Sequence, residues 1–273
     1  MIFGIQKTIL VPVFVVATYQ VFAQPPITRP AFDHFDVATI KPTAPDWKGG
    51  AYFRMQGGHR FIVQNYTVQS LVAAAWNLPT RLVSGGPAWS STDSYDIVAG
   101  TPGELPPDRD EQMSMLRKLL LERFKLTFHR ETKRILIYEL RVANSGPKMK
   151  QSEGPPPEGR PAPVFSLFPV RRARLPARDA TMAEFASVLP HGAVDRPAVD
   201  KTGLTGRYDF VLDWAPDESD FDGMMRALPP LADDSSEPGL FTAVQQQLGL
   251  KLVPARGPID TIVLEHVERP ADN

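Results

Sequence analysis

The feature that most constrains the fold is a series of predicted elements that occurs twice along the chain. One amphipathic helix is predicted to begin at Thr67 and another at Thr181, because apolar residues follow each threonine at the i, i+3, i+4 spacing of a buried helix face. A strand that begins Tyr-Asp follows each helix: Tyr95 lies 28 positions after Thr67, and Tyr208 lies 27 positions after Thr181. The sequence therefore predicts an α+β protein of two tandem related units, each with two helices packed on short mixed or antiparallel sheets.

Each predicted unit ends with a second helix and two closing strands. The second helices are predicted over residues 113–124 and 240–248, and Gly249 is placed to end the latter in a left-handed conformation. The closing strands are predicted in pairs, 125–130 with 136–142 and 251–254 with 261–267. Thr181 and Glu184 have the spacing of a capping box, which supports the helix start in the second unit.

The first 23 residues have the composition of a signal peptide. Lys7 precedes an apolar stretch over residues 8–22, and Val21 and Ala23 occupy the small-residue positions of a cleavage site. The stretch is shorter than the roughly 20 residues that a membrane-spanning helix needs. We therefore expect cleavage between Ala23 and Gln24 and export to the periplasm or the extracellular space.

A Pro- and Gly-rich stretch at residues 144–163 shows no apolar periodicity and is predicted to be a linker. The predicted organisation is a signal peptide at 1–23, a first unit at 24–143, the linker, and a second unit at 164–273.

Composition excludes several classes of protein. The chain has 30 Lys and Arg against 31 Asp and Glu, so it lacks the basic excess of most nucleic-acid binders. Without cysteine it has no disulfide, thiol nucleophile or Cys-zinc site. Charge is nevertheless uneven: residues 24–150 carry 17 basic against 12 acidic residues, net +5, and residues 151–273 carry 12 against 19, net −7. This asymmetry is compatible with docking of the halves on each other or of one half on a charged partner.

Three short motifs resemble catalytic or metal sites, but each lacks an essential part. Asp200-Lys-Thr-Gly has the sequence of a phosphorylated-aspartate motif without the acidic loops that hold its metal, so a turn is the simpler interpretation. The acidic loop at 218–223 has calcium-loop spacing, but Pro229 stands where the bidentate Glu is needed. His129-Arg-Glu131 lacks the Cys pair of a zinc deaminase. We therefore predict no catalytic residue, no metal and no cofactor.

A basic stretch and two tryptophans are the candidate interaction residues. A solvated helix face explains the basic stretch most simply, and a docking surface is the alternative. The candidates are Arg117, Arg123, Lys125 and Arg130 in the basic stretch, together with Trp89 and Trp214 near predicted loops or strand ends.

Several motifs together resemble a known family. They are Phe35–Pro42, Gly85–Trp89, Met115–Phe124, Val199–Phe210 and Gln247–Leu252. These segments resemble the soil-associated exported protein family, a domain of unknown function, over nearly the whole mature chain. The element order in each half is also similar to the short N-terminal domain of secretins and TonB-dependent receptors, which binds other proteins in the periplasm. The resemblance implies export and supplies no reaction.

The sequence thus favours an exported, soluble, non-catalytic binding module whose partner is another exported or envelope protein or a small ligand. A small-ligand sensor domain and a hydrolase with dispersed catalytic residues are the alternatives. An apolar cleft between the halves favours the sensor, and converging titratable groups in a pocket favour the hydrolase.

Overall fold

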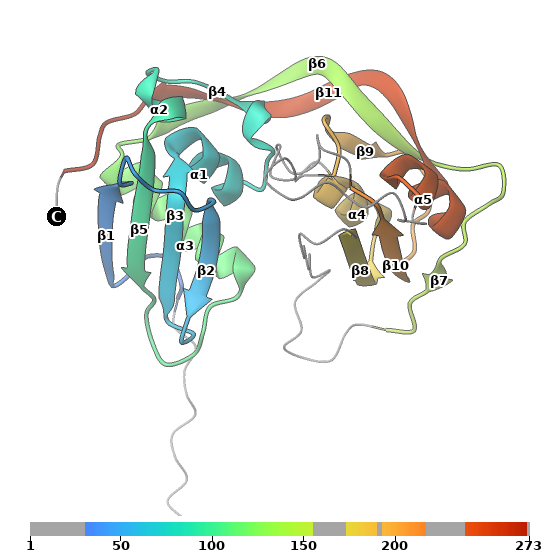
Figure 1. Ribbon diagram of the computed structural model, residues 1–273, viewed down its shortest axis with the longest axis horizontal. Helices are drawn as coiled ribbons and strands as arrows, with labels where there is room; N and C mark the ends of the chain where they lie inside the picture. Colours follow the sequence, from blue (N-terminus) through green and yellow to red (C-terminus); the bar gives the residue numbers. More distant parts are fainter. Residues whose placement is uncertain (1–30, 155–172, 190–192, 217–237, 272–273) are drawn as a thin grey trace, which may run out of the picture.

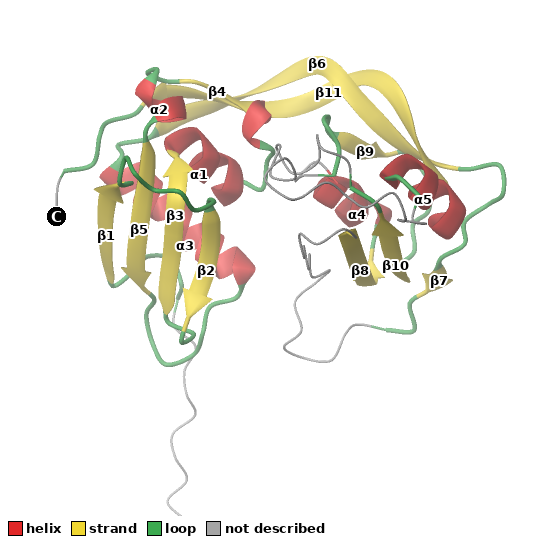
Figure 2. Ribbon diagram, viewed as in Figure 1, coloured by secondary structure: helices red, strands yellow, loops and turns green. Residues whose placement is uncertain are grey.

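The computed structural model describes residues 31–154, 173–189, 193–216 and 238–271, which form two cores joined by a long two-stranded ribbon (Figures 1 and 2). Helices and strands occur together in both cores, which confirms the predicted α+β class. The predicted signal peptide, its cleavage site at Ala23 and Gln24, and the acidic loop at 218–223 lie outside the described residues. Among the described residues, no helix has the length and apolar character needed to cross a membrane.

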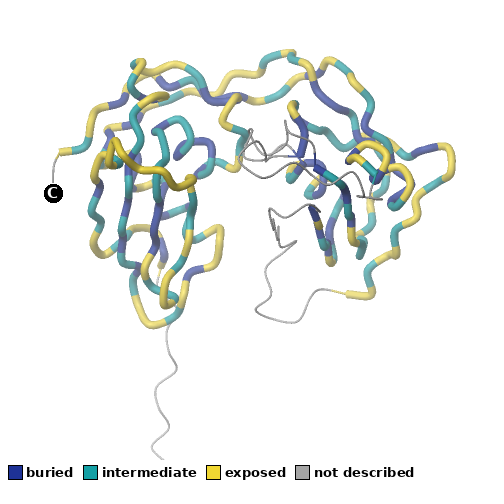
Figure 3. The backbone as a smooth tube through the Cα atoms, in the orientation of Figure 1, coloured by how far each residue is buried: buried dark blue, intermediate teal, exposed yellow. Residues whose placement is uncertain are grey.

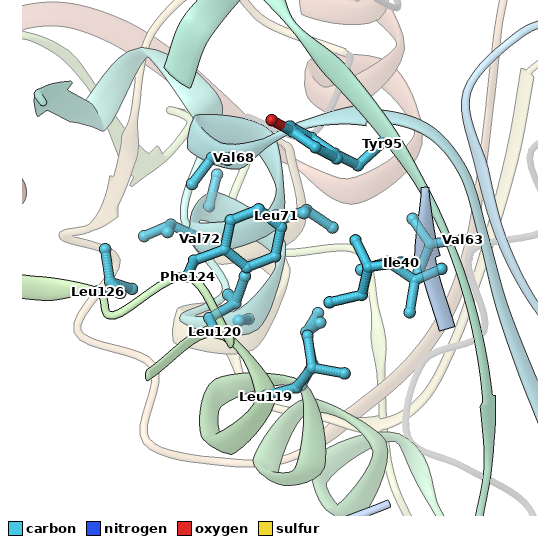
Figure 4. Packing of buried hydrophobic residues seen from close by; sticks show 14 of the residues in the cluster. Ile40, Val63, Val68, Leu71, Val72, Tyr95, Leu119, Leu120, Phe124 and Leu126 are labelled. Atoms are coloured by element: carbon cyan, nitrogen blue, oxygen red, sulfur yellow. The ribbon is translucent and has the colours of Figure 1, made fainter. Parts of the chain in front are cut away.

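The N-terminal core is built on a four-stranded antiparallel sheet in the order β1-β5-β3-β2. Its strands are β1 (Val37–Pro42), β2 (Tyr52–Gln56), β3 (Arg60–Thr67) and β5 (Ser94–Gly100). Apolar side chains of α1 (Val68–Ala75) and α3 (Arg109–Arg123) pack with those of the sheet, as Figure 4 shows. Two short helical elements, η1 (Thr80–Leu82) and α2 (Trp89–Thr92), belong to the same part of the chain.

The C-terminal core has a smaller sheet in the order β7-β10-β8. Its elements are β7 (Lys150–Gln151), β8 (Ala173–Ala180), α4 (Met182–Val188), β10 (Tyr208–Trp214) and α5 (Leu240–Leu248). Strand β7 lies inside the predicted linker and pairs with Tyr208 and Asp209 of β10, so the linker prediction is wrong at residues 150–151. Backbone pairing with an ordered strand holds this short segment although its composition is typical of a linker.

Helices α1 and α4 begin where their capping residues predict, whereas α3 begins at Arg109, four residues before the predicted start at 113. Thr67 caps α1, and Thr181 and Glu184 form the predicted capping box at the start of α4. Asp108 and Glu111 form a second box at the start of α3. These side chains satisfy backbone N–H groups that have no partner within the helix, and one such cap stabilises a helix by about 1 kcal/mol.

The ribbon consists of β6 (Thr127–Val142) and β11 (Leu250–His266), which pair antiparallel along their length. Short parallel strands add to its edges: β4 (Val83–Gly85) pairs with β11 and β9 (Ala198–Asp200) pairs with β6. The predicted closing strands are therefore wrong as two separate pairs, because each pair is one continuous strand. Long-range pairing overrides the Gly-Pro turn signal at residues 257–258.

Each ribbon strand runs from one core into the other. The far end of β11 contributes Ile262 and Leu264 to the N-terminal core, whereas the far end of β6 contributes Tyr138 and Leu140 to the C-terminal core. In Figure 3 the buried positions gather in the two cores, and the ribbon passes between them. The division of the chain at residues 143 and 164 consequently does not separate the two cores.

One local detail recurs in both cores and explains the repeated Tyr-Asp motif. Asn65 and Asp179 both have left-handed backbones, with φ of 59° and 50°, two residues before a capping threonine. The backbone N–H of Asn65 donates to Asp96 Oδ1 at 3.0 Å, and that of Asp179 donates to Asp209 Oδ1 at 2.8 Å. Each motif aspartate thus satisfies the irregular backbone before a helix. Descent of the two halves from one unit stays a prediction.

Candidate functional site

One face of the ribbon packs on the two cores and is called its inner face; this face is apolar at both ends and becomes polar at the midpoint. Where the ribbon covers a core, this face is apolar, with Ile262 at one end and Leu140 at the other. Between them the same face carries Arg134, Leu136 and Arg256, since alternate residues of a strand share a face and Leu136 lies opposite Arg256. All three midpoint side chains are exposed.

A cleft of about 360 Å³ lies at this midpoint, lined by residues from both cores and the ribbon. Element η1 lines it from the N-terminal core, the ribbon forms its floor, and the loop before β9 lines it from the C-terminal core. The lining residues are Arg81, Leu82, Arg134, Ile135, Leu136, Asp195, Arg196, Pro197 and Arg256.

The cleft is strongly cationic. Four arginines face one aspartate, which leaves a formal charge of +3 on the lining. The aspartate is already engaged: Asp195 accepts hydrogen bonds from the Tyr138 hydroxyl at 3.0 Å and from Arg196 Nε at 3.0 Å. Arg134 and Arg256 have no hydrogen bond or ion pair with any residue that the structure describes. Their guanidinium groups are therefore available to an anion.

Tyr138 holds the C-terminal wall of the cleft in place. Its backbone N–H donates to the carbonyl of Pro197 at 2.8 Å, and its ring lies 5.2 Å below the guanidinium of Arg196. Phe241 packs edge-on against the same ring at 5.2 Å. The Arg196 side chain is thus positioned by Asp195 on one side and by an aromatic face on the other.

Burial raises the pKa of the Tyr138 hydroxyl, and the hydrogen bond to Asp195 and the charge of that carboxylate raise it further. The neutral hydroxyl is favoured in the folded chain, so its stabilising effect is present below the ordinary tyrosine pKa of about 10 and is lost as pH rises through the higher folded value. Burial also raises the pKa of Tyr66 and of Tyr95, so we expect absorbance titration near 295 nm to show several late-ionising tyrosines, one of which Tyr138→Phe removes. An unchanged titration curve in that variant would contradict the assignment.

The arrangement is suited to binding an anion. Guanidinium groups bind carboxylates and phosphates through parallel hydrogen bonds, and a cleft lined by charges of one sign concentrates their field on an anion. Among the described residues, no group of three or more His, Asp or Glu side chains lies close enough to hold a metal ion. Arg134 and Arg256 come from the floor of the cleft, and Arg196 from its wall.

The predicted interaction residues do not form one surface. Arg117 donates from Nε to the carbonyl of Ala75 at 2.8 Å, and Arg123 donates to the carbonyl of Ala38 at 3.3 Å. Both side chains therefore tie α3 to its neighbours. Lys125 is exposed just beyond α3.

The remaining candidates are also dispersed. Trp89 lies under the guanidinium of Arg269 at 4.7 Å, and Trp214 is 1% exposed inside the C-terminal core. The prediction is wrong for Trp214, because a side chain packed in a core cannot meet a partner. Arg130 lies on the inner face of the ribbon, four residues before Arg134 on the same strand, and is exposed. It is the predicted residue that lies nearest in sequence to the cleft.

Two of the three motifs that lack essential parts lie among the described residues, and both have structural partners. Asp200 Oδ1 accepts hydrogen bonds from the backbone N–H and the hydroxyl of Thr202, which makes the segment a turn after β9. His129 Nδ1 lies 2.9 Å from Glu265 on the exposed end of the ribbon. Neither group lines the cleft.

Sequence reasoning missed the cleft arginines because they are dispersed. Arg81, Arg134, Arg196 and Arg256 lie about 50–60 positions apart and share no motif. The one available signal was Pro254-Ala-Arg-Gly-Pro258, an arginine between two prolines. In the structure these prolines lie in β11 where no further strand of the described residues pairs with its outer edge, which is the setting in which strands accept proline.

Comparison with protein families gives one match. A family described as a protein of unknown function, DUF3738, matches residues 69–267, which include the C-terminal core, the ribbon, the part of the N-terminal core that follows β3, and all four cleft arginines. No curated protein and no solved structure matches the chain significantly.

Proposed function

The chain belongs to the DUF3738 family, whose function is unknown, and we propose that it is a non-catalytic binding module that holds an anionic ligand in the arginine-lined cleft. The observation that carries this proposal is the convergence of arginines from two cores and the ribbon on one cleft whose single carboxylate is already hydrogen-bonded. Exposed positions on the ribbon, η1 and the loop before β9 require polar side chains, but they do not require four of one charge on one cleft.

The cleft discriminates among the functions that the sequence left open. An apolar cleft would favour a sensor of neutral ligands, whereas this lining is cationic and favours an anion. Asp195 is its one carboxylate, and both of its described partners orient it within the wall. A binding role, for a small anion or for an acidic group of another protein, therefore accounts for these residues better than hydrolysis does.

The proposed location is outside the cytoplasm. The apolar segment at 8–22, the small residues Val21 and Ala23, and the resemblance to soil-associated exported proteins support this address. The similarity in element order to secretin and TonB-receptor domains, and the descent of the halves from one unit, belong to the same proposal. Intact mass of the protein recovered from its host tests the address, with Gln24 as the expected first residue.

Charge removal in the cleft tests the binding function. We expect the full chain to bind citrate or inorganic phosphate in a salt-dependent manner, and Arg134→Gln with Arg256→Gln to weaken binding by at least about tenfold, because each lost guanidinium removes a charge-assisted contact. Isothermal titration calorimetry at two salt concentrations gives both quantities.

Lys133 provides a matched control. It is adjacent to Arg134 but on the outer face of the ribbon, where it pairs with Glu131 at 3.0 Å. Lys133→Gln removes one positive charge, as each of the two cleft substitutions does by itself, and is expected to leave anion binding within about twofold. Equal losses in the control and in the cleft variants would show a general charge effect and overturn the site.

A further inference from the structure

Two exposed apolar side chains lie beside the cleft arginines. Large hydrophobic side chains with substantial exposure are few in the described chain: Val37, Trp47, Leu121, Leu136, Val211 and Phe241. Leu136 is 46% exposed on the cleft floor opposite Arg256, and Phe241 is 47% exposed at the start of α5. Burial of either side chain would be favourable, and neither is needed to fill its own core.

Tyr138 connects these two side chains into one strip. It lies two residues from Leu136 on the same strand face, a separation of about 7 Å, and its ring is 5.2 Å from that of Phe241. The guanidinium of Arg196 lies over the same ring. The apolar strip Leu136–Tyr138–Phe241 therefore begins at the arginines and continues away from them along the C-terminal core.

Resting on the proposed function, we propose that the ligand carries its anionic group on an apolar ring system: the carboxylate meets Arg134, Arg256 and Arg196, and the ring lies against Leu136 and Phe241. These two side chains are the exposed ends of the strip, whereas Tyr138 between them is 8% exposed beneath Arg196. A small inorganic anion would satisfy the arginines and leave the two exposed ends of the strip, Leu136 and Phe241, in water. A planar ring matches it better, because the flat face can lie along Leu136 and meet the aromatic edge of Phe241. The cleft volume is in the range of sites for ligands of this size.

Three probes separate the two parts of such a ligand. We would titrate the full chain with 2-naphthoate, which has ring and charge, with acetate, which has the charge alone, and with 2-naphthamide, which has the ring alone. The expected result is that 2-naphthoate binds at least about tenfold more tightly than either of the others, as measured by calorimetry or by chemical-shift titration.

Variants assign each part to its residues. Phe241→Ala and Leu136→Gln, each made alone, are expected to weaken the binding of 2-naphthoate about three- to tenfold and to leave the binding of acetate unchanged. Arg256→Gln is expected to weaken the binding of both anions. Both apolar positions are about half exposed, so these variants are expected to fold, and the thermal unfolding midpoint checks this. Val211→Ala, at an exposed apolar position on β10, is the matched control and is expected to change nothing.

Each alternative outcome has a distinct meaning. If acetate and 2-naphthoate bind equally and Arg256→Gln weakens both, the anion site stands and the ring-bearing ligand is overturned. If 2-naphthamide binds as tightly as 2-naphthoate, or if none of the anions binds, the anion site itself is overturned as well. An acidic peptide that binds in an Arg256-dependent manner while 2-naphthoate does not would replace the small ligand by a protein partner and overturn the inference.

Discussion

Replacing Ile262 by alanine is expected to destabilise the N-terminal core by about 2–5 kcal/mol, although Ile262 belongs to the last strand of the chain. Its side chain is 1% exposed and packs in the core built by β1, β3, β5, α1 and α3. It also lies opposite Val83 of β4 and Arg130 of β6. Removal of the buried side chain leaves a cavity, and the two neighbouring strands restrict how far the site can collapse.

Denaturant unfolding measures this effect, and Ile259→Ala is the matched control. Ile259 lies three positions earlier on the same strand, opposite Lys133 on the outer face, and is only partly buried. Its loss is expected to cost less than about 1.5 kcal/mol. Trp76 and Trp89 report on the N-terminal core and Trp214 on the C-terminal core, so fluorescence follows both. A loss of stability confined to the C-terminal core would contradict the packing of the far end of β11 in the N-terminal core.

Because β6 and β11 each have one end in each core, we also expect the two cores to unfold together. Leu140 of β6 is fully buried in the C-terminal core, as Ile262 of β11 is in the N-terminal core. Each ribbon strand is continuous across the midpoint and has one end in each core. If one core unfolds, both strands lose their pairing at that end, and the ribbon no longer supports the core at the other end. We therefore expect a single transition with coincident signals from circular dichroism and fluorescence.

Local elements could be predicted from sequence because their causes are local. The start of α4 follows from Thr181 and Glu184, and the αL end of α5 follows from Gly249. The apolar spacing after Thr67 predicts α1 because one face of that helix packs on the sheet. In each case a few residues in one segment decide the conformation.

The ribbon and the cleft could not be predicted because their causes are distant in sequence. Residues 131–135 contain no glycine or proline, yet the sequence pattern predicts two strands where β6 is one. No local signal indicates that β11 pairs with β6 along its length. The cleft depends on that pairing: Arg134 and Arg256 become neighbours on the ribbon, and Arg196 joins them from the loop before β9. Charge patterning along the chain instead favoured Arg117 and Arg123, which serve as packing residues.

Replacing Gly249 by alanine is expected to destabilise the chain by at least about 2 kcal/mol. Gly249 ends α5 with φ of +66°, a left-handed conformation that costs a non-glycine residue about 1–2 kcal/mol. A Cβ atom there would also collide with the carbonyl oxygen of Gly146, a backbone atom that cannot rotate away. The Gly249 carbonyl accepts the backbone N–H of Ala143 at 2.9 Å, so any shift that relieves the collision strains a contact at the end of the ribbon.

Lys125 provides the opposite test at the end of α3. It has nearly the same backbone, with φ of +50°, but it is exposed, so space for its Cβ is not limiting. Lys125→Gly is expected to change stability by no more than about 1 kcal/mol, because relief of the left-handed strain opposes the greater chain entropy of glycine in the unfolded state. Chemical denaturation of both variants separates the two causes. Effects of similar size and opposite sign would mean that backbone conformation alone matters, whereas a large loss in Gly249→Ala beside a small change in Lys125→Gly would show that close packing of Gly249 against Gly146 fixes the junction between α5 and the ribbon.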